Sequence, residues 1–90
     1  MIIKPNIHQV QIYKKIRALS NRCRFKIIEI TNSEPASITS LSKKLNLSYT
    51  KCCDYVAILE KEGLISKNKE GKKVIVKSKV KLNNSSLNFL

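Results

Sequence analysis

Apolar side chains recur at helical spacing along the first third of the chain. One stripe lies within residues 7–19 and a second within residues 21–31, directly after Ser20. The stripes consist of Val10, Tyr13, Ile16 and Leu19, and of Cys23, Ile27 and Ile30. Because an α-helix completes a turn every 3.6 residues, the spacing predicts two helices, with Ser20 as the N-cap of the second.

A short third helix is predicted after the turn-rich segment TNSEPAS at residues 31–37. It covers residues 40–45, and Thr39 is its predicted N-cap. Asn46, which tolerates the left-handed backbone conformation, ends it, and Leu47 is expected to reach the core.

The fourth predicted helix covers residues 49–62, with Ser48 as its N-cap and Gly63 at its end. Its inward stripe is Cys52, Val56 and Leu59. Two helices joined by so tight a turn predict a helix-turn-helix.

After Gly63 the pattern changes from helical to alternating. Leu64 and Ile65 begin a strand, NKEGKK at residues 68–73 contains the glycine of a hairpin turn, and VIVKSKVKL alternates apolar with mostly basic residues. The sequence therefore predicts a mainly α fold with a small β-hairpin, a winged helix-turn-helix whose wing covers residues 66–79. A single domain is expected over residues 1–90, with a core at about 6–81 and an uncharged tail at 82–90.

Charge points to a polyanionic partner. Lysine and arginine number 18 against six acidic residues, which gives a net charge of +12, and the excess lies at residues 1–26 and 67–81. A solvated lysine surface is the alternative reading. Six scattered acids, one histidine, two glycines and no phosphate-binding loop provide no catalytic centre, so we expect no enzyme and no catalytic residues. No apolar run approaches a membrane span, and we expect a cytoplasmic protein without a membrane partner.

The three cysteines are not expected to bind a shared metal ion. Adjacent positions on a helix point about 100° apart, so Cys52 and Cys53 do not face one metal ion. Cys23 and Cys52 fall on apolar stripes, where a thiol packs as a small hydrophobe. Cys53 falls on the outward side of its helix, where it could contact a base or be oxidised. His8 has no companion at zinc-binding spacing, so neither a metal nor a cofactor is expected.

The stretch from Ala18 to Lys77 resembles the winged helix-turn-helix regulators of archaea and bacteria, the ArsR-like group and small archaeal winged-helix proteins in particular. The matching features are ALSNRCR, LSKKLNLS, LEKEGLI and EGKKVIV. The resemblance implies that residues 48–62 form a recognition helix in the major groove and that the wing lies over the adjacent minor groove or backbone. The DNA-facing residues that it implies are Ser48, Tyr49, Thr50, Lys51, Cys53, Asp54, Lys43, Lys69, Lys72 and Lys73.

Two features qualify this resemblance. Metal-sensing members carry a Cys-x-Cys site on the positioning helix, where this chain reads SLSKKL, so metal sensing is not implied. Asp54 is repelled by phosphate, and it either accepts a hydrogen bond from a cytosine amino group or turns toward a lysine.

The function expected from these features is sequence-specific regulation by a homodimer bound to double-stranded DNA. The first helix, together with Leu87, Phe89 and Leu90 of the tail, is the expected dimer interface. Two alternatives are an architectural protein that binds DNA without specificity and a winged-helix module that binds protein or RNA.

Overall fold

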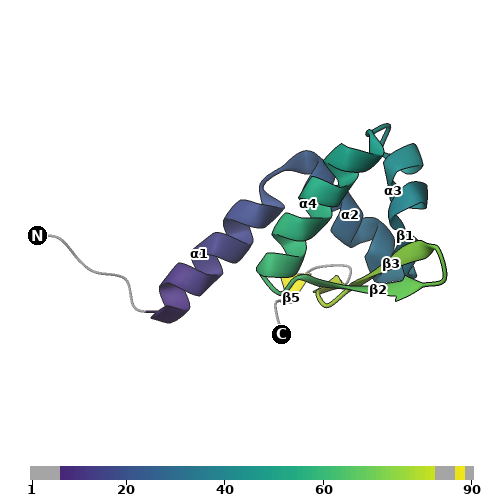
Figure 1. The fold of residues 1–90 in the computed structure, drawn as a ribbon. Helices are drawn as coiled ribbons and strands as arrows, with labels where there is room; N and C mark the ends of the chain where they lie inside the picture. Colours follow the sequence, from purple (N-terminus) through teal and green to yellow (C-terminus); the bar gives the residue numbers. More distant parts are fainter. Residues whose placement is uncertain (1–6, 83–86, 89–90) are drawn as a thin grey trace, which may run out of the picture.

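The computed structural model describes residues 7–82 and 87–88 of the chain. Within them, four helices and two small antiparallel sheets form the mainly α, winged helix-turn-helix fold that the sequence predicts (Figure 1). The elements in chain order are α1 (Ile7–Leu19), α2 (Arg22–Ser33), β1 (Ala36–Ser37), α3 (Ile38–Lys44), α4 (Tyr49–Lys61), β2 (Ile65–Glu70), β3 (Lys73–Ser78), β4 (Lys81–Leu82) and β5 (Leu87–Asn88).

Helix α1 projects from the body of the molecule and is anchored at its C-terminal end (Figure 1). Ala18 and Leu19 are buried there. The predicted Ser20 cap of α2 is wrong, because the Ser20 hydroxyl donates to the Arg17 carbonyl oxygen (2.7 Å) and so belongs to the end of α1. Asn21 caps α2 instead, where its side-chain oxygen accepts from the Arg24 amide (3.0 Å).

Helix α3 begins earlier than predicted. Its N-cap is Ser37, whose hydroxyl oxygen accepts from the Ser40 amide (3.1 Å), and the predicted cap Thr39 lies within the first turn. Ile38, at the first helical position, is buried, and β1 just before it pairs with β3. The sheet therefore has three strands in the order β1-β3-β2, one more than the predicted hairpin.

The same backbone motif ends both helices of the helix-turn-helix. At the end of α3 the Leu47 amide donates to the Ser42 carbonyl (2.8 Å), and Asn46 has a φ of 55°, as predicted. At the end of α4 the Leu64 amide donates to the Leu59 carbonyl (3.0 Å), beside Gly63 at a φ of 73°. This is the Schellman pattern, in which a left-handed residue satisfies the last carbonyls and turns the next apolar side chain inward.

The core lies between the helices and the base of the wing. The inward stripe of α4 is completely buried, as predicted: Cys52, Val56 and Leu59 each have no exposed surface. Further buried side chains come from every neighbouring element: Ile27, Ile28, Ile38, Leu41, Leu64, Ile65 and Val76. The body is therefore built around one face of α4, which fixes the rotation of that helix about its axis.

The wing is a two-residue hairpin between β2 and β3. Gly71 and Lys72 form its turn, with Glu70 paired to Lys73, and Gly71 has a φ of 63°. A positive φ at the first turn residue alone fits a type II′ turn, which matches the twist of the strands. An ion pair between Lys67 Nζ and Glu60 Oε1 (3.5 Å) links β2 to α4, but both side chains are about 40% exposed, so it contributes little to stability.

The tail contains a strand pair that the sequence did not predict. Lys81 pairs with Asn88, and Leu82 pairs with Leu87, in an antiparallel arrangement. Phe89 and Leu90, which the sequence assigns to a dimer interface, lie outside the described residues. None of the described helices is long and apolar enough to cross a bilayer.

The cysteines differ in burial. Cys52 is completely buried, and its Sγ donates a long hydrogen bond to the Ile38 carbonyl (3.7 Å), whereas Cys23 and Cys53 are half-buried. Burial, and secondarily the charge of Cys53, raises the pKa of the Cys52 thiol. Cys52 therefore stays protonated in the folded protein at pH values where an ordinary thiol ionises.

Replacing Leu59 with alanine should destabilise the fold by about 2–5 kcal/mol, because the change leaves a cavity beneath α4. Ile58→Ala is the matched control at the next residue, where the side chain is 40% exposed, and it should cost less than about 1 kcal/mol. Urea unfolding followed by circular dichroism measures both. Equal losses would contradict the assigned rotation of α4.

Alkylation of the native protein with iodoacetamide at about pH 8, near the ordinary thiol pKa, should modify Cys53 and Cys23 before Cys52. Buried, protonated Cys52 should react only after unfolding in denaturant. Peptide mass spectrometry over time reads out each position. Modification of Cys52 as fast as the half-buried pair would show that the inner face of α4 opens to solvent.

Candidate nucleic-acid interface

The N-terminal half of α4 presents a polar flank to solvent. Because the apolar stripe faces inward, Ser48, Tyr49, Thr50, Lys51 and Asp54 are all exposed, with Tyr49 at 51%. These are five of the six positions that the sequence assigns to the outward side of this helix. Figure 1 places this end of α4 beside α3, at the end of the molecule remote from α1.

Ser48 caps α4 as predicted. Its hydroxyl oxygen accepts a hydrogen bond from the Lys51 amide (3.1 Å), with Ser48 in an extended conformation. The other amides of the first turn have no partner within a helix, and they carry the positive end of the helix dipole. An exposed helix start of this kind suits a phosphate oxygen.

Lys51 lies along the helix rather than straight out from it. Its Nζ is 5.0 Å from the ring centroid of Tyr55, one turn further on, and the Arg24 guanidinium carbon lies 5.5 Å from the same centroid. Each cation gains from the electron-rich ring face. Tyr55 therefore connects Lys51 on the polar flank with Arg24 on α2.

Cys53 does not lie on the fully outward face that the sequence predicted. It is half-buried and packs against the core, because its position on the helix turns it toward the wing. There it lines an open hollow of about 360 Å³ between α4 and the wing, together with Tyr49 and Lys69. We call this the wing hollow; its other lining residues are Ile38, Lys67, Asn68 and Val74.

Tyr49 and Cys53 interact across one turn of α4. The charge of Cys53 raises the pKa of the Tyr49 hydroxyl, with smaller contributions from burial, from a side-chain hydrogen bond to Cys53 and from the charge of Cys52. The hydroxyl is therefore protonated at neutral pH and can donate or accept a hydrogen bond. The pair adds a hydroxyl and a thiol to the wing hollow, which Lys67, Asn68 and Lys69 also line.

A second open hollow, of about 490 Å³, lies between α3 and the wing. It brings Lys43 and Lys73, which the sequence proposes separately, to one place. Its remaining lining residues are Ser37, Thr39, Ser40 and Lys44. We call this the α3 hollow; three ammonium groups and three hydroxyls are the groups that contact sugar-phosphate backbones.

Several of these lining residues were missed from the sequence. Thr39, Ser40 and Lys44 join the α3 hollow because β1 pairs with β3, and a two-residue strand has no periodicity to reveal that pairing. Lys67 and Asn68 reach the wing hollow from β2. Lys72, at the wing turn, is exposed and lines neither hollow.

Asp54 is exposed and takes part in neither of the two ion pairs found among the described residues. The structure therefore does not show the lysine-directed orientation that was one of its two expected arrangements. Its carboxylate remains available as a hydrogen-bond acceptor on the polar flank.

Metal-binding side chains do not gather in the described part of the chain, where no group of three from histidine, cysteine, aspartate and glutamate could hold an ion. The second half of α3 contains Ser42, Lys43 and Lys44, none of which is a usual metal ligand. The chemistry of the site is that of cations and hydroxyls.

Solved structures of other proteins share this fold. HlyU from Vibrio cholerae N16961 aligns with a TM-score of 0.77 at 23% identity, over 82% of this chain and 80% of that one. NolR from Sinorhizobium fredii aligns with a TM-score of 0.76 at 18% identity, over 88% and 81%. The homodimeric winged helix-turn-helix DNA-binding domain of Mb0332 from Mycobacterium bovis, a possible ArsR-family transcriptional regulator, gives 0.73 at 16% identity, over 87% and 75%.

At these identities the structural likeness concerns the fold. No curated protein sequence matches the chain. The family model described as winged helix-turn-helix matches residues 20–85, most of the chain. The chain therefore belongs to the winged helix-turn-helix family.

Proposed function

We propose that this protein is a transcriptional regulator that binds a specific sequence of double-stranded DNA as a homodimer in the cytoplasm. The observation that carries the proposal is the exposed polar flank of α4, Ser48 to Asp54, which stands beside the basic wing hollow and α3 hollow. The net charge of +12 favours association with a polyanion. All the DNA-contacting groups proposed below belong to the end of the molecule remote from α1.

In this proposal α4 enters the major groove with its N-terminal half against the base edges. Tyr49 and Thr50 offer hydroxyls and apolar surface to a thymine methyl, and Lys51 reaches a guanine or a phosphate. Asp54 accepts from a cytosine amino group, the base-pair feature that best tolerates a carboxylate. Cys53 borders the base edges from the wing hollow rather than facing them directly.

The backbone contacts come from the lysines around the polar flank. Lys43 and Lys73 meet in the α3 hollow, Lys69 lines the wing hollow, and Lys72 extends from the wing turn. Each phosphate that they neutralise releases counterions, so the logarithm of the affinity falls by about 0.9 per phosphate for each tenfold rise in salt. These contacts position the protein, while α4 supplies specificity.

The dimer surface that we propose is the exposed side of α1. Ile12, Tyr13 and Ile16 are 51%, 62% and 53% exposed, and their spacing places them on one face. We call them the α1 trio. Apolar side chains so exposed on a projecting helix are typical of a surface that another chain covers. The tail residues Leu87, Phe89 and Leu90 remain the second part of the proposed interface.

Selection of bound duplexes from a random pool, followed by filter binding, tests specificity. Wild type should prefer the selected site, and Lys51→Ala should lose about 1–3 kcal/mol on that site and less on random DNA. Lys73→Ala should weaken both equally and reduce the salt slope by about 0.9. Lys79→Ala is the charge-matched control, because Lys79 directly follows the end of β3 that is remote from the wing turn. Equal wild-type affinity for selected and random DNA would instead indicate an architectural protein.

Ile16→Glu should convert the protein to a monomer, because it places an unpaired charge in the proposed interface. Sedimentation equilibrium should give wild type twice the 10.3 kDa mass of one chain and a dissociation constant roughly 100-fold higher for the variant. Gln11→Glu adds the same charge at an exposed position on another face of α1 and should remain dimeric. An intact Ile16→Glu dimer would place the interface elsewhere.

A further inference from the structure

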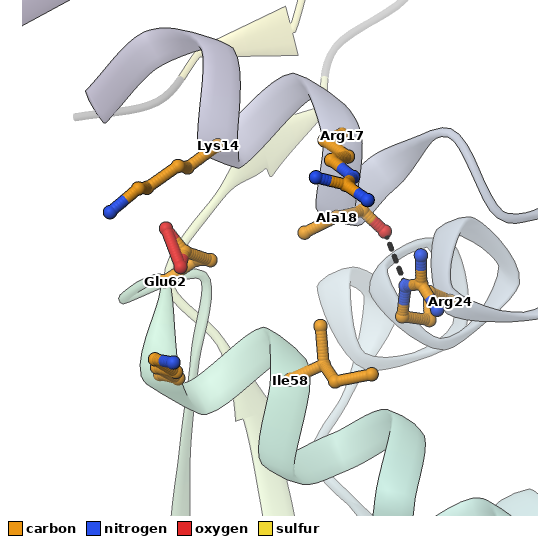
Figure 2. A pocket seen from close by; sticks show the side chains of 7 residues that line it. Lys14, Arg17, Ala18, Arg24, Ile58 and Glu62 are labelled. Atoms are coloured by element: carbon orange, nitrogen blue, oxygen red, sulfur yellow. Dashed lines mark hydrogen bonds between the residues drawn. The ribbon is translucent and has the colours of Figure 1, made fainter. Parts of the chain in front are cut away.

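A cleft separates the C-terminal halves of α1 and α4, on the far side of the molecule from the wing turn (Figure 2). Its volume is about 380 Å³, within the range of small-molecule sites. Ala18 of α1 and Ile58 of α4 form its apolar floor, and Ile58 is 40% exposed. None of the DNA-facing residues proposed above lines this cleft.

The rim of the cleft is strongly basic. Lys14 and Arg17 come from α1, Arg24 from α2 and Lys61 from α4, against the single carboxylate of Glu62. No ion pair found among the described residues involves any of the five. Four cations without an acidic partner beside an apolar floor favour an anionic occupant.

The charges divide between the two ends of the cleft. Figure 2 shows Arg17 and Arg24 on either side of Ala18, whereas Lys14 and Glu62 lie at the opposite end. The carboxylate therefore does not stand between the two arginines. Ile58 lies below them and leaves an apolar surface next to the arginine end.

Arg24 is held in a fixed position at this end. Its Nε donates to the Ala18 carbonyl oxygen (2.6 Å), and its guanidinium carbon lies 5.5 Å from the ring centroid of Tyr55. A guanidinium has five N–H donors in a planar fork, and the Ala18 bond uses one of them. Because these contacts already order the Arg24 side chain, binding an anion costs less side-chain entropy than it would at a freely rotating arginine.

We propose that this cleft is a binding site for a small organic anion, a carboxylate or phosphate group on an apolar body. Arg17 and Arg24 receive the charged group, for which the guanidinium fork is the geometric match. Ala18 and Ile58 receive the apolar body. Lys14 and Lys61 add long-range attraction from the rim.

The cleft stays open in the proposed complexes. Ile58 and Lys61 are seven and ten residues beyond Lys51, so the cleft lies about 10–15 Å along α4 from that lysine. On α1, at 100° per residue, Lys14 and Ala18 point about 150° or more away from the mean direction of the α1 trio, and Arg17 points about 90° away from it. A duplex on the polar flank and a second chain on the α1 trio therefore both leave the floor at Ala18 and Ile58 uncovered.

Occupation of the cleft has a consequence for DNA binding, and this part rests on the proposed function. The ring of Tyr55 contacts Arg24 from the cleft side and Lys51 from the DNA side. An anion that binds the Arg24 guanidinium weakens its attraction to the ring. Because Lys51 interacts with the same ring, anion binding at Arg24 alters the interaction between Tyr55 and Lys51 on the polar flank.

Phenyl phosphate is a suitable probe, with inorganic phosphate and phenol as its charged and apolar halves. In amide NMR titrations of the wild-type chain it should bind with a Kd of about 1 mM or lower and shift resonances of α1, Arg24 and Ile58. Each half alone should bind about tenfold more weakly. Arg17→Gln should weaken phenyl phosphate about tenfold, and Lys79→Gln, with the same charge loss outside the cleft, should not. Ile58→Ser should weaken phenyl phosphate but not inorganic phosphate.

Shifts spread equally over the wing lysines, an unchanged affinity in Arg17→Gln, or equal binding of inorganic phosphate would each overturn the proposal in favour of general anion attraction. Circular dichroism confirms that the variants fold. The DNA proposal fails separately: Arg17→Gln should bind DNA within about twofold of wild type without probe, and Lys51→Ala should retain phenyl phosphate binding. If the protein shows no DNA specificity but still binds phenyl phosphate, the DNA proposal is wrong and the anion site is supported.

Discussion

Burial of one face of α4 is the constraint on which the rest of the structure depends. Cys52, Val56 and Leu59 occur at helical spacing and have no exposed surface, so the helix has a single rotation about its axis. That rotation turns Ser48, Thr50 and Lys51 outward. It also turns Cys53 to the wing and Ile58 toward α1. The positions of the polar flank, the wing hollow and the cleft therefore all follow from the burial of three side chains of α4.

The Schellman motifs that end α3 and α4 set the directions of the elements that follow these helices. Each places a left-handed residue, Asn46 or Gly63, just past a helix and sends the next leucine toward the core. The first sets the direction in which α4 leaves α3, and the second sets the direction in which β2 leaves α4. The wing and the polar flank consequently lie at one end of the molecule, and α1 lies at the other.

Apolar residues at helical spacing, together with capping residues, made the four helices predictable to within two residues at every end. Helix α4 buries its predicted stripe completely, whereas α1 leaves Tyr13 and Ile16 of its stripe exposed. Cap positions were less predictable. Before α2, Ser20 and Asn21 are both possible N-caps, and Asn21 is the one that caps the helix. Before α3, Ser37 and Thr39 are both possible N-caps, and Ser37 caps the helix because Ile38 is buried in the core at the first helical position. The strands β1, β4 and β5 have two residues each, too few to show alternation. The α3 hollow and the cleft unite residues from separate elements, which no local pattern reveals.

The excess positive charge is divided by this architecture into two regions with different chemistry. Around α4's polar flank the cations are lysines accompanied by hydroxyls on open surfaces, an arrangement suited to an extended phosphate backbone. In the cleft, two arginines lie beside apolar side chains, and Arg24 is held by a hydrogen bond to a backbone carbonyl.

The most direct measurement of the central claim is an amide NMR titration of the intact protein with duplex DNA. The largest shifts should fall in residues 48–54 and 69–73, whereas shifts confined to α1 or the tail, with residues 48–54 unchanged, would contradict the assignment of α4's outer flank to DNA.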